Sequence, residues 1–232
     1  PLLHLDTIDV TGRTLGERLD EPLDWIDRAI VRPAGDPVSP VGGLVSLSGS
    51  LAPDGAILKR AAATPDLFER EDRAVVFDGL EDLARRIDDP DLDVTPDDFL
   101  VLRNAGPVAA GMPEAGYLPI PRKLARQGVR DMVRISDARM SGTAFGTIVL
   151  HVAPEAAVGG PLAAVRGGDR IRLSVAQRRI DLLVDDAEIA RRLAGHAAWP
   201  SPARGYAALY RRSVMQAPEG CDFDFLTGAE EG

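Results

Sequence analysis

Three loops of this 232-residue chain combine small and polar residues in a way that could bind a ligand or perform chemistry. They cover residues 48–55, residues 103–107 followed by 111–114, and residues 136–147, and each follows a run with the pattern of a β-strand. Small residues let the backbone come close to a ligand, and hydroxyl or carboxylate groups can then reach it. The three loops are therefore predicted to form a ligand-facing rim.

In the third loop, Ser141 stands next to Gly142. Its hydroxyl could bind an anion, or act as a base or nucleophile. A glycine-rich turn with exposed serines is the commoner structure for such a pair, and the residues alone leave both interpretations open. His151 could partner Ser141, but it lies in an apolar run, where a hydrogen-bonded core histidine is the commoner case.

Glu114 follows Met112 and Pro113 at a point where a helix could begin. It could therefore be a first-turn charge on that helix or a ligand for a hard metal ion. Cys221 is the only cysteine of the chain, so it cannot pair within the chain or build a zinc or iron–sulfur site by itself. We interpret it as a packed anchor of the C-terminal tail.

The composition is that of a globular protein, with 45% hydrophobic and 27% charged residues. Because 27 Lys and Arg oppose 36 Asp and Glu, the net charge is −9, which argues against nucleic acid as a partner. The longest apolar tract, residues 144–165, is interrupted by His151, Pro154 and Glu155, so no membrane span is predicted. The start has neither an initiator Met nor a signal peptide, and we expect a cut chain of a cytoplasmic protein.

Residues 1–41 are predicted to be a lead-in segment, because their prolines exclude long regular structure. Residues 42–232 show short β-rich runs between glycine and proline turns. Nine strands are predicted: 43–47, 56–59, 74–77, 99–103, 132–135, 147–152, 161–165, 171–175 and 180–184. Three helices should flank them, one capped by Asp78, one by Asp185, and a last one opened by Ser201 and Pro202. The fold class is therefore mainly β with flanking helices (α+β), as a closed or nearly closed β-barrel, with a doubly wound sheet as the weaker alternative.

Six ordered motifs resemble one family, the dihydroxy-acid dehydratase/6-phosphogluconate dehydratase family of iron–sulfur dehydratases. They are residues 51–56, 102–107, 111–114, 136–147, 151–156 and 159–163. The resemblance is to the C-terminal domain of that family, which has the swivelling-domain barrel of aconitase-like enzymes. Residues 141–147 and the tail 221–226 look like the sugar-acid (aldonate) branch, such as arabinonate or xylonate dehydratases. Residues 1–41 would then be the end of a missing N-terminal domain.

The resemblance implies a hydro-lyase that removes water from a 2,3-dihydroxy sugar acid to give a 2-keto-3-deoxy acid, with an iron–sulfur cluster and magnesium in the complete enzyme. It makes Ser141 the catalytic base, Thr143 a substrate-binding hydroxyl and Glu114 a magnesium ligand. The family's cluster cysteines lie in the N-terminal domain, so no cofactor should bind this chain tightly, and the chain alone should be inactive. The relatives usually form homo-oligomers.

Three alternatives stay open. The complete protein could be a dihydroxy-acid dehydratase of branched-chain amino-acid synthesis. The chain could instead be a non-catalytic barrel that binds an anion or a partner. It could also be one subunit of a complex in which a second subunit supplies the missing dehydratase domain.

Overall fold

The computed structural model describes residues 3–22, 25–110, 117–140, 145–197 and 199–227. The chain divides into two compact units, residues 1–41 and 42–232. Among the described residues, no helix is long and apolar enough to cross a membrane.

The first unit contains one short helix, α1 (Leu15–Leu19). Thr14 caps it and forms a capping box with Glu17, which satisfies two backbone N–H groups that the first turn leaves free. Arg18 of α1 pairs with Asp9, and Arg13 and Glu21, on either side of the helix, pair with each other. None of the described residues of this unit is buried, so these residues form no apolar core among themselves.

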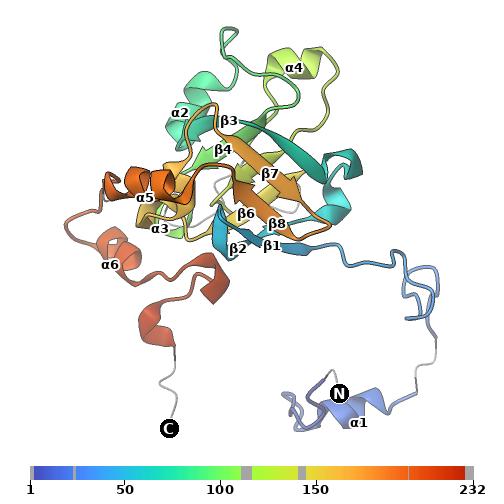
Figure 1. Cartoon of the computed structure of the whole chain (residues 1–232). Coiled ribbons are helices and arrows are strands. Elements are labelled where there is room, and N and C mark those ends of the chain that lie inside the picture. The colour runs from blue at the N-terminus through green and yellow to red at the C-terminus, as the bar shows by residue number, and fades with distance from the viewer. Residues whose placement is uncertain (1–2, 23–24, 111–116, 141–144, 198, 228–232) are drawn as a thin grey trace. The chain divides into compact units, whose positions relative to one another are not determined.

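The second unit is a closed barrel of eight strands in the order β1-β2-β6-β5-β4-β3-β7-β8 (Figure 1). The strands are β1 (Val45–Gly49), β2 (Ala52–Leu58), β3 (Glu69–Asp78), β4 (Phe99–Arg103), β5 (Arg134–Ser136), β6 (Ile148–Ala153), β7 (Arg170–Ser174) and β8 (Arg179–Leu182). The mainly-β barrel predicted from the sequence is thus confirmed.

The strands β3, β4, β5 and β6 are parallel to one another, and the remaining pairs are antiparallel except for a parallel bridge between β1 and β8. The carboxyl ends of β3 to β6 therefore lie at one end of the barrel. We call this end the rim, and define it by Asp78, Arg103, Ser136 and Ala153, the last residues of these four strands. The antiparallel hairpin β7–β8 closes the ring, because β7 pairs with β3 and β8 bridges to β1.

Apolar side chains form two cores. One fills the inside of the barrel, where Leu47, Phe99 and Ile135 are almost fully buried. The second lies on the outer face of β3 and β4, where Phe77 and Leu102 pack with residues of two helices and of the loops between strands. Burial on both faces explains why β4 is a continuous apolar run, as expected for a central parallel strand.

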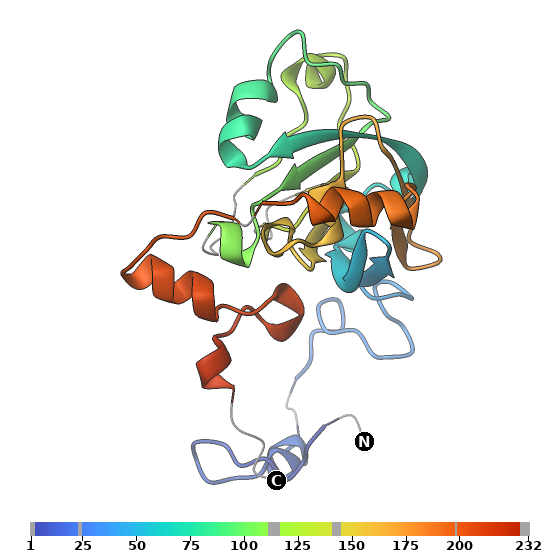
Figure 2. The ribbon, with the colours of Figure 1, turned by 60° about the vertical axis from the view of Figure 1, so that its left-hand side comes forward.

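Five α-helices of the described chain flank the barrel: α2 (Leu80–Arg86), α3 (Pro107–Ala110), α4 (Arg122–Arg126), α5 (Asp186–Ala194) and α6 (Tyr206–Ser213). Short 3-10 helices cover Arg60–Ala62, Pro65–Leu67, Ala156–Val158, Pro161–Ala164, Ala217–Glu219 and Asp224–Leu226. The views in Figures 1 and 2 agree that α2 and α4 lie on one side of the barrel and α6 on the opposite side.

Three details of the sequence prediction are wrong. The predicted strand 161–165 is instead a 3-10 helix over Pro161–Ala164, because Pro161 takes its first turn and the N–H of Ala163 bonds to the Gly160 carbonyl. Asp78 does not cap α2; the N-cap is Gly79, and the Asp82 carboxylate accepts the Asp78 N–H. The last helix begins after Gly205, beyond Ser201 and Pro202.

Candidate functional site

The three site residues expected from the sequence, Glu114, Ser141 and Thr143, lie outside the described residues. The structure does describe the chain on both sides of them. One segment leaves the described structure after Ala110 and returns at Tyr117, and the other leaves after Met140 and returns at Phe145. The residues that hold the two ends of each segment therefore define the candidate site.

Asp137, directly after β5, joins three loops at the rim. Its carboxylate accepts hydrogen bonds from the backbone N–H groups of Asn104 at 3.1 Å, Ala105 at 3.0 Å and Ala156 at 3.0 Å. The residue is only 1% exposed. Buried backbone N–H groups need partners, so one carboxylate satisfies the turns that follow β4 and β6 and ties both to the segment leading to Ser141.

The protonation of Asp137 reflects two opposing influences. Complete burial raises its pKa, and the nearby Glu155 carboxylate acts in the same direction, while the three N–H donors lower it; the result is a pKa of about 7. A carboxyl group that titrates near neutral pH thus lies three residues from the end of the described segment.

Glu155 anchors the segment that leads to Glu114, as Asp137 anchors the segment that leads to Ser141. Its carboxylate accepts the N–H groups of Val108 at 2.8 Å and Ala109 at 3.2 Å, in the first turn of α3, where negative charge is favourable. Gln216, from the C-terminal tail, donates its side-chain amide to the same carboxylate at 2.9 Å and accepts the Glu155 N–H at 2.9 Å. Helix α3 and the tail therefore share one buried anchor.

Asn104 brings a buried acceptor to the rim. Its backbone is left-handed (φ 59°), and its side-chain amide donates to Asp78 at 2.6 Å. Among the residues that the structure describes, its buried Oδ1 has no hydrogen-bond partner, which is rare for a buried acceptor. The neighbouring Arg103 also donates to Asp78, at 3.1 Å, and to the carbonyl oxygens of Ala163 and Val165. These contacts fix the turn after β4.

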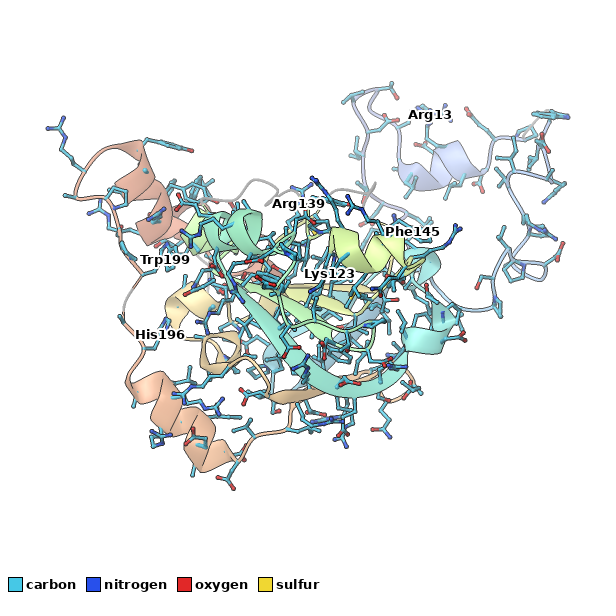
Figure 3. The ribbon with its side chains drawn as sticks, turned by 90° about the horizontal axis from the view of Figure 1, so that it is seen from above. Arg13, Lys123, Arg139, Phe145, His196 and Trp199 are labelled. Atoms are coloured by element: carbon cyan, nitrogen blue, oxygen red, sulfur yellow. The ribbon has the colours of Figure 1, made fainter. Side chains whose placement is uncertain are left out.

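The far ends of the two segments meet at one buried ion pair. Arg134 of β5 donates to the carbonyl oxygens of Leu118 and Phe145, the points at which the two segments have re-entered the described structure. Asp131 is its anionic partner at 3.1 Å. Tyr117 and Phe145, next to the segments, are 66% and 68% exposed. Phe145 is labelled in Figure 3.

His151 is half-buried and does not lie in the barrel core. It lines a cavity of about 280 Å³ with Ser46, Asp54 and the tail residues Ala217 and Pro218. Burial lowers its pKa, and the charge of Arg139 acts in the same direction. The neutral imidazole is therefore favoured at this position.

Cys221 is partly buried in the tail, where desolvation raises the pKa of its thiol and the Glu155 charge adds to that effect. A raised pKa disfavours the reactive thiolate, which fits the interpretation of Cys221 as a packing residue.

The residues present do not fit an iron–sulfur cluster, because the chain has a single cysteine. Within the described ranges, no group of three His, Cys, Asp or Glu side chains is placed to hold a metal ion. Glu114 is outside those ranges, and the structure does not test it as a ligand.

The sequence analysis missed the anchoring roles of Arg134, Asp137 and Glu155. A signal existed for Arg134, because it is a lone charge inside the apolar run 132–135. A charged side chain within a buried strand must be paired, and Asp131 is close by in sequence. The cross-loop bonds of Asp137 and Glu155 depend on contacts that the sequence does not reveal.

Comparison with known proteins gives the family context. Residues 29–221 match the sequence model described as the dihydroxy-acid/6-phosphogluconate dehydratase C-terminal domain. The chain is 52% identical over 236 residues to a 6-deoxy-6-sulfo-D-gluconate dehydratase of Pseudomonas putida, with 99% of the chain and 40% of the relative covered. It is 46% identical over 232 residues to an L-arabinonate dehydratase of Rhizobium leguminosarum bv. trifolii (98% and 39% covered).

A dihydroxy-acid dehydratase of Acidothermus cellulolyticus is 43% identical over 227 residues, with 94% of the chain and 38% of the relative covered. The chain thus spans about two-fifths of the length of these curated relatives. Both sugar-acid dehydratases are more similar to it than this dihydroxy-acid dehydratase is.

Proposed function

The chain belongs to the dihydroxy-acid/6-phosphogluconate dehydratase family, and from this premise we propose that it is the C-terminal domain of a hydro-lyase that acts on a sugar acid. The observation that carries the proposal is the 52% identity, over 99% of the chain, to a dehydratase whose name gives a sulfonated gluconate as its substrate. The substrate class would be a 2,3-dihydroxy acid and the product a 2-keto-3-deoxy acid.

In this proposal Ser141 is the base. Its oxygen takes the proton from carbon 2, the C–H electron pair forms the double bond between carbons 2 and 3, and the hydroxyl group leaves carbon 3. The elements of water are lost, and the resulting enol tautomerises to the 2-keto acid. A serine hydroxyl is not ionised at neutral pH, so the reaction requires positive charge next to the Ser141 oxygen.

Thr143 would contact a substrate hydroxyl, and Glu114 would be one ligand of a magnesium ion. Two features of the described structure support placing these residues in one site. Asp137 joins the loop that leads to Ser141 with the loop that leads to Glu114, and Arg134 contacts the residues that follow both. Residues that are 27 positions apart in sequence thus belong to segments anchored at the same two places.

The iron–sulfur cluster and the remaining magnesium ligands of the proposed enzyme would come from protein outside this chain, since the described residues do not supply them. We propose that the corresponding part of the longer relatives is this partner, as a domain or as a subunit. The absence of buried residues in the described part of unit 1–41 supports the proposal, because apolar residues such as Trp25 (77% exposed) need a surface to cover them.

The test uses a full-length protein that contains this domain. It is assayed with L-arabinonate, with 6-deoxy-6-sulfo-D-gluconate and with a branched 2,3-dihydroxy acid, and formation of the 2-keto acid is measured. Turnover of either sugar acid is expected. Preferential turnover of the branched acid would assign the dihydroxy-acid alternative, and no turnover of any of them would favour a non-catalytic barrel. The 232-residue chain alone, supplied with iron and magnesium, is expected to be inactive.

Ser141→Ala in the full-length protein is expected to abolish turnover while the substrate still binds, because the base acts mainly in the transition state. The control is Ser201→Ala, at an exposed serine far along the chain, which should leave the rate unchanged. If Ser141→Ala retains more than about a tenth of the rate, a barrier change of only ~1.4 kcal/mol, Ser141 is not the base.

A further inference from the structure

Arg134 is a charged residue in the interior of the domain. It lies in β5, is 3% exposed, and pairs with Asp131, whose side chain is 5% exposed. Taking two charges out of water costs several kcal/mol, and an apolar pair of similar size often gives equal stability. Stability alone therefore does not account for the pair, and its role has to be inferred from its contacts.

The contacts of the pair go mainly to the main chain of two separate segments. Arg134 Nη1 donates to the Leu118 carbonyl at 3.0 Å, and Nη2 donates to the Phe145 carbonyl at 2.7 Å. Leu118 is four residues after Glu114, and Phe145 is four residues after Ser141. One guanidinium group thus holds the main chain at the fourth residue after each of the two proposed site residues.

Asp131 holds Thr147, two residues beyond Phe145. Its carboxylate accepts the Thr147 N–H at 2.9 Å and the Thr147 hydroxyl at 2.8 Å. The same hydroxyl oxygen accepts the N–H of Thr64 at 3.1 Å, and the Gly146 N–H bonds to Ala62 at 2.8 Å. The return of this segment is therefore tied to the ion pair and to the connection between β2 and β3.

Gly146 shows how closely the backbone approaches the pair. A Cβ at this position would lie 1.9 Å from Arg134 Nη2 and 2.4 Å from Asp131 Oδ1, and the residue has φ +114°. Only glycine can bring its backbone to that position without displacing the pair. The close approach is thus specific to the residue types at 131, 134 and 146.

We propose that Arg134 and Asp131 are positioning residues, which hold residues 117–118 and 145–147, the described chain directly after the Glu114 and Ser141 segments, in a fixed relation to each other. This inference rests on the proposed function for its effect on catalysis. Arginine is required because its planar fork donates to two carbonyl oxygens and a carboxylate at once, whereas lysine is a single point charge on a flexible stem.

The experiment compares Arg134→Lys with wild type in the full-length protein. The control is Arg122→Lys, at an arginine whose side chain is 75% exposed and paired with Asp88. Both kcat and KM are measured, together with hydrogen exchange of peptides that contain residues 117–119 and 145–147. A misplacement of about 1 Å can cost two orders of magnitude in rate, so Arg134→Lys is expected to lower kcat between about tenfold and a hundredfold. KM should change less than kcat.

Exchange in Arg134→Lys should become faster at residues 117–119 and 145–147. It should stay unchanged at Ala105 and Ala156, whose N–H groups are held by Asp137. A second pair of variants covers the case in which Arg134→Lys does not fold. Thr147→Val removes the hydroxyl that donates to Asp131 and is expected to lower kcat. Thr147→Ser keeps this hydroxyl and should have the kcat of wild type.

Unchanged exchange at residues 117–119 and 145–147 in Arg134→Lys would overturn the inference, as would a kcat equal to that of the Arg122→Lys control. Equal kcat values in Thr147→Val and Thr147→Ser would do the same. Failure of the proposed function is a separate result, seen as no turnover of any of the tested acids by the wild-type full-length protein, and it leaves the exchange measurement informative about the ion pair.

Discussion

Gly106 and Glu155 lie in close contact at the rim: a Cβ at position 106 would come within 2.6 Å of the Glu155 Oε2 atom. Glu155 cannot move away easily, because Val108, Ala109 and Gln216 all donate to its carboxylate. The turn before α3 and the loop after β6 are therefore fitted to each other with no space for one methyl group.

Gly106→Ala is expected to destabilise the barrel unit by about 1–3 kcal/mol, because overpacking a tight contact displaces side chains and backbone. Gly167→Ala is the matched control, since a Cβ there meets nothing within 4 Å. Urea unfolding of the two variants and wild type measures the difference. Equal unfolding free energies for the two variants would contradict the close contact.

Asp137→Asn is expected to lower the free energy of unfolding by about 1–3 kcal/mol. The side-chain amide of asparagine has one accepting oxygen, so at least one of the N–H groups of Asn104, Ala105 and Ala156 loses its partner. Asp66→Asn, at an exposed carboxylate, is the control and should change stability by less than about 0.5 kcal/mol. Thermal unfolding at pH 7 provides the comparison.

Asp131 is expected to make the stability of the barrel unit fall in acid. Burial raises its pKa, but hydrogen bonds from Thr147 and Thr64 and the charge of Arg134 lower it more, so the folded pKa lies below the ordinary 3.8. The stabilisation is therefore complete above pH 3.8 and is lost as the pH falls through the lowered folded pKa. Melting temperatures of wild type and Asp131→Asn should converge as the pH falls through that range. Parallel pH curves for the two proteins would count against this assignment.

Glu114→Gln in the full-length protein is expected to raise the magnesium concentration needed for half-maximal activity by about tenfold or more, equivalent to ~1.4 kcal/mol of binding. Glu81→Gln is the control, because Glu81 is an exposed carboxylate in the first turn of a helix. If both variants show the wild-type magnesium titration, Glu114 is a helix-terminal charge and not a ligand.

The strands were predictable where local pattern and burial agree. The alternation of residues 170–175 and the apolar run 99–103 each appear as a strand in the structure, β7 and β4. The run 161–165 is equally apolar, yet its first four residues, Pro161–Ala164, form a 3-10 helix, because the Gly160 and Pro161 turn chemistry outweighs the hydrophobic pattern. The barrel order could not be read from the sequence, since it depends on pairings between distant strands such as β3 with β7.

In the candidate site, too, contacts between residues far apart in the chain could not be predicted from the sequence. The motifs drew attention to Ser141, Thr143 and Glu114, which stay predictions, and the loops that contain them were expected to share a rim. The residues that join these loops were not expected. Asp137 bonds to residues 32 and 33 positions before it and 19 after it, and separations of this kind leave no periodic signal in the chain.

The closure of the barrel by β7 and β8 has a consequence for how the protein is made. The strands β1 and β3 are synthesised early, but their second neighbours belong to residues 170–182. Until the ribosome releases that hairpin, both strands present open edges that can pair with other chains. A nascent chain halted before residue 170 is therefore expected to depend on a chaperone to stay in solution.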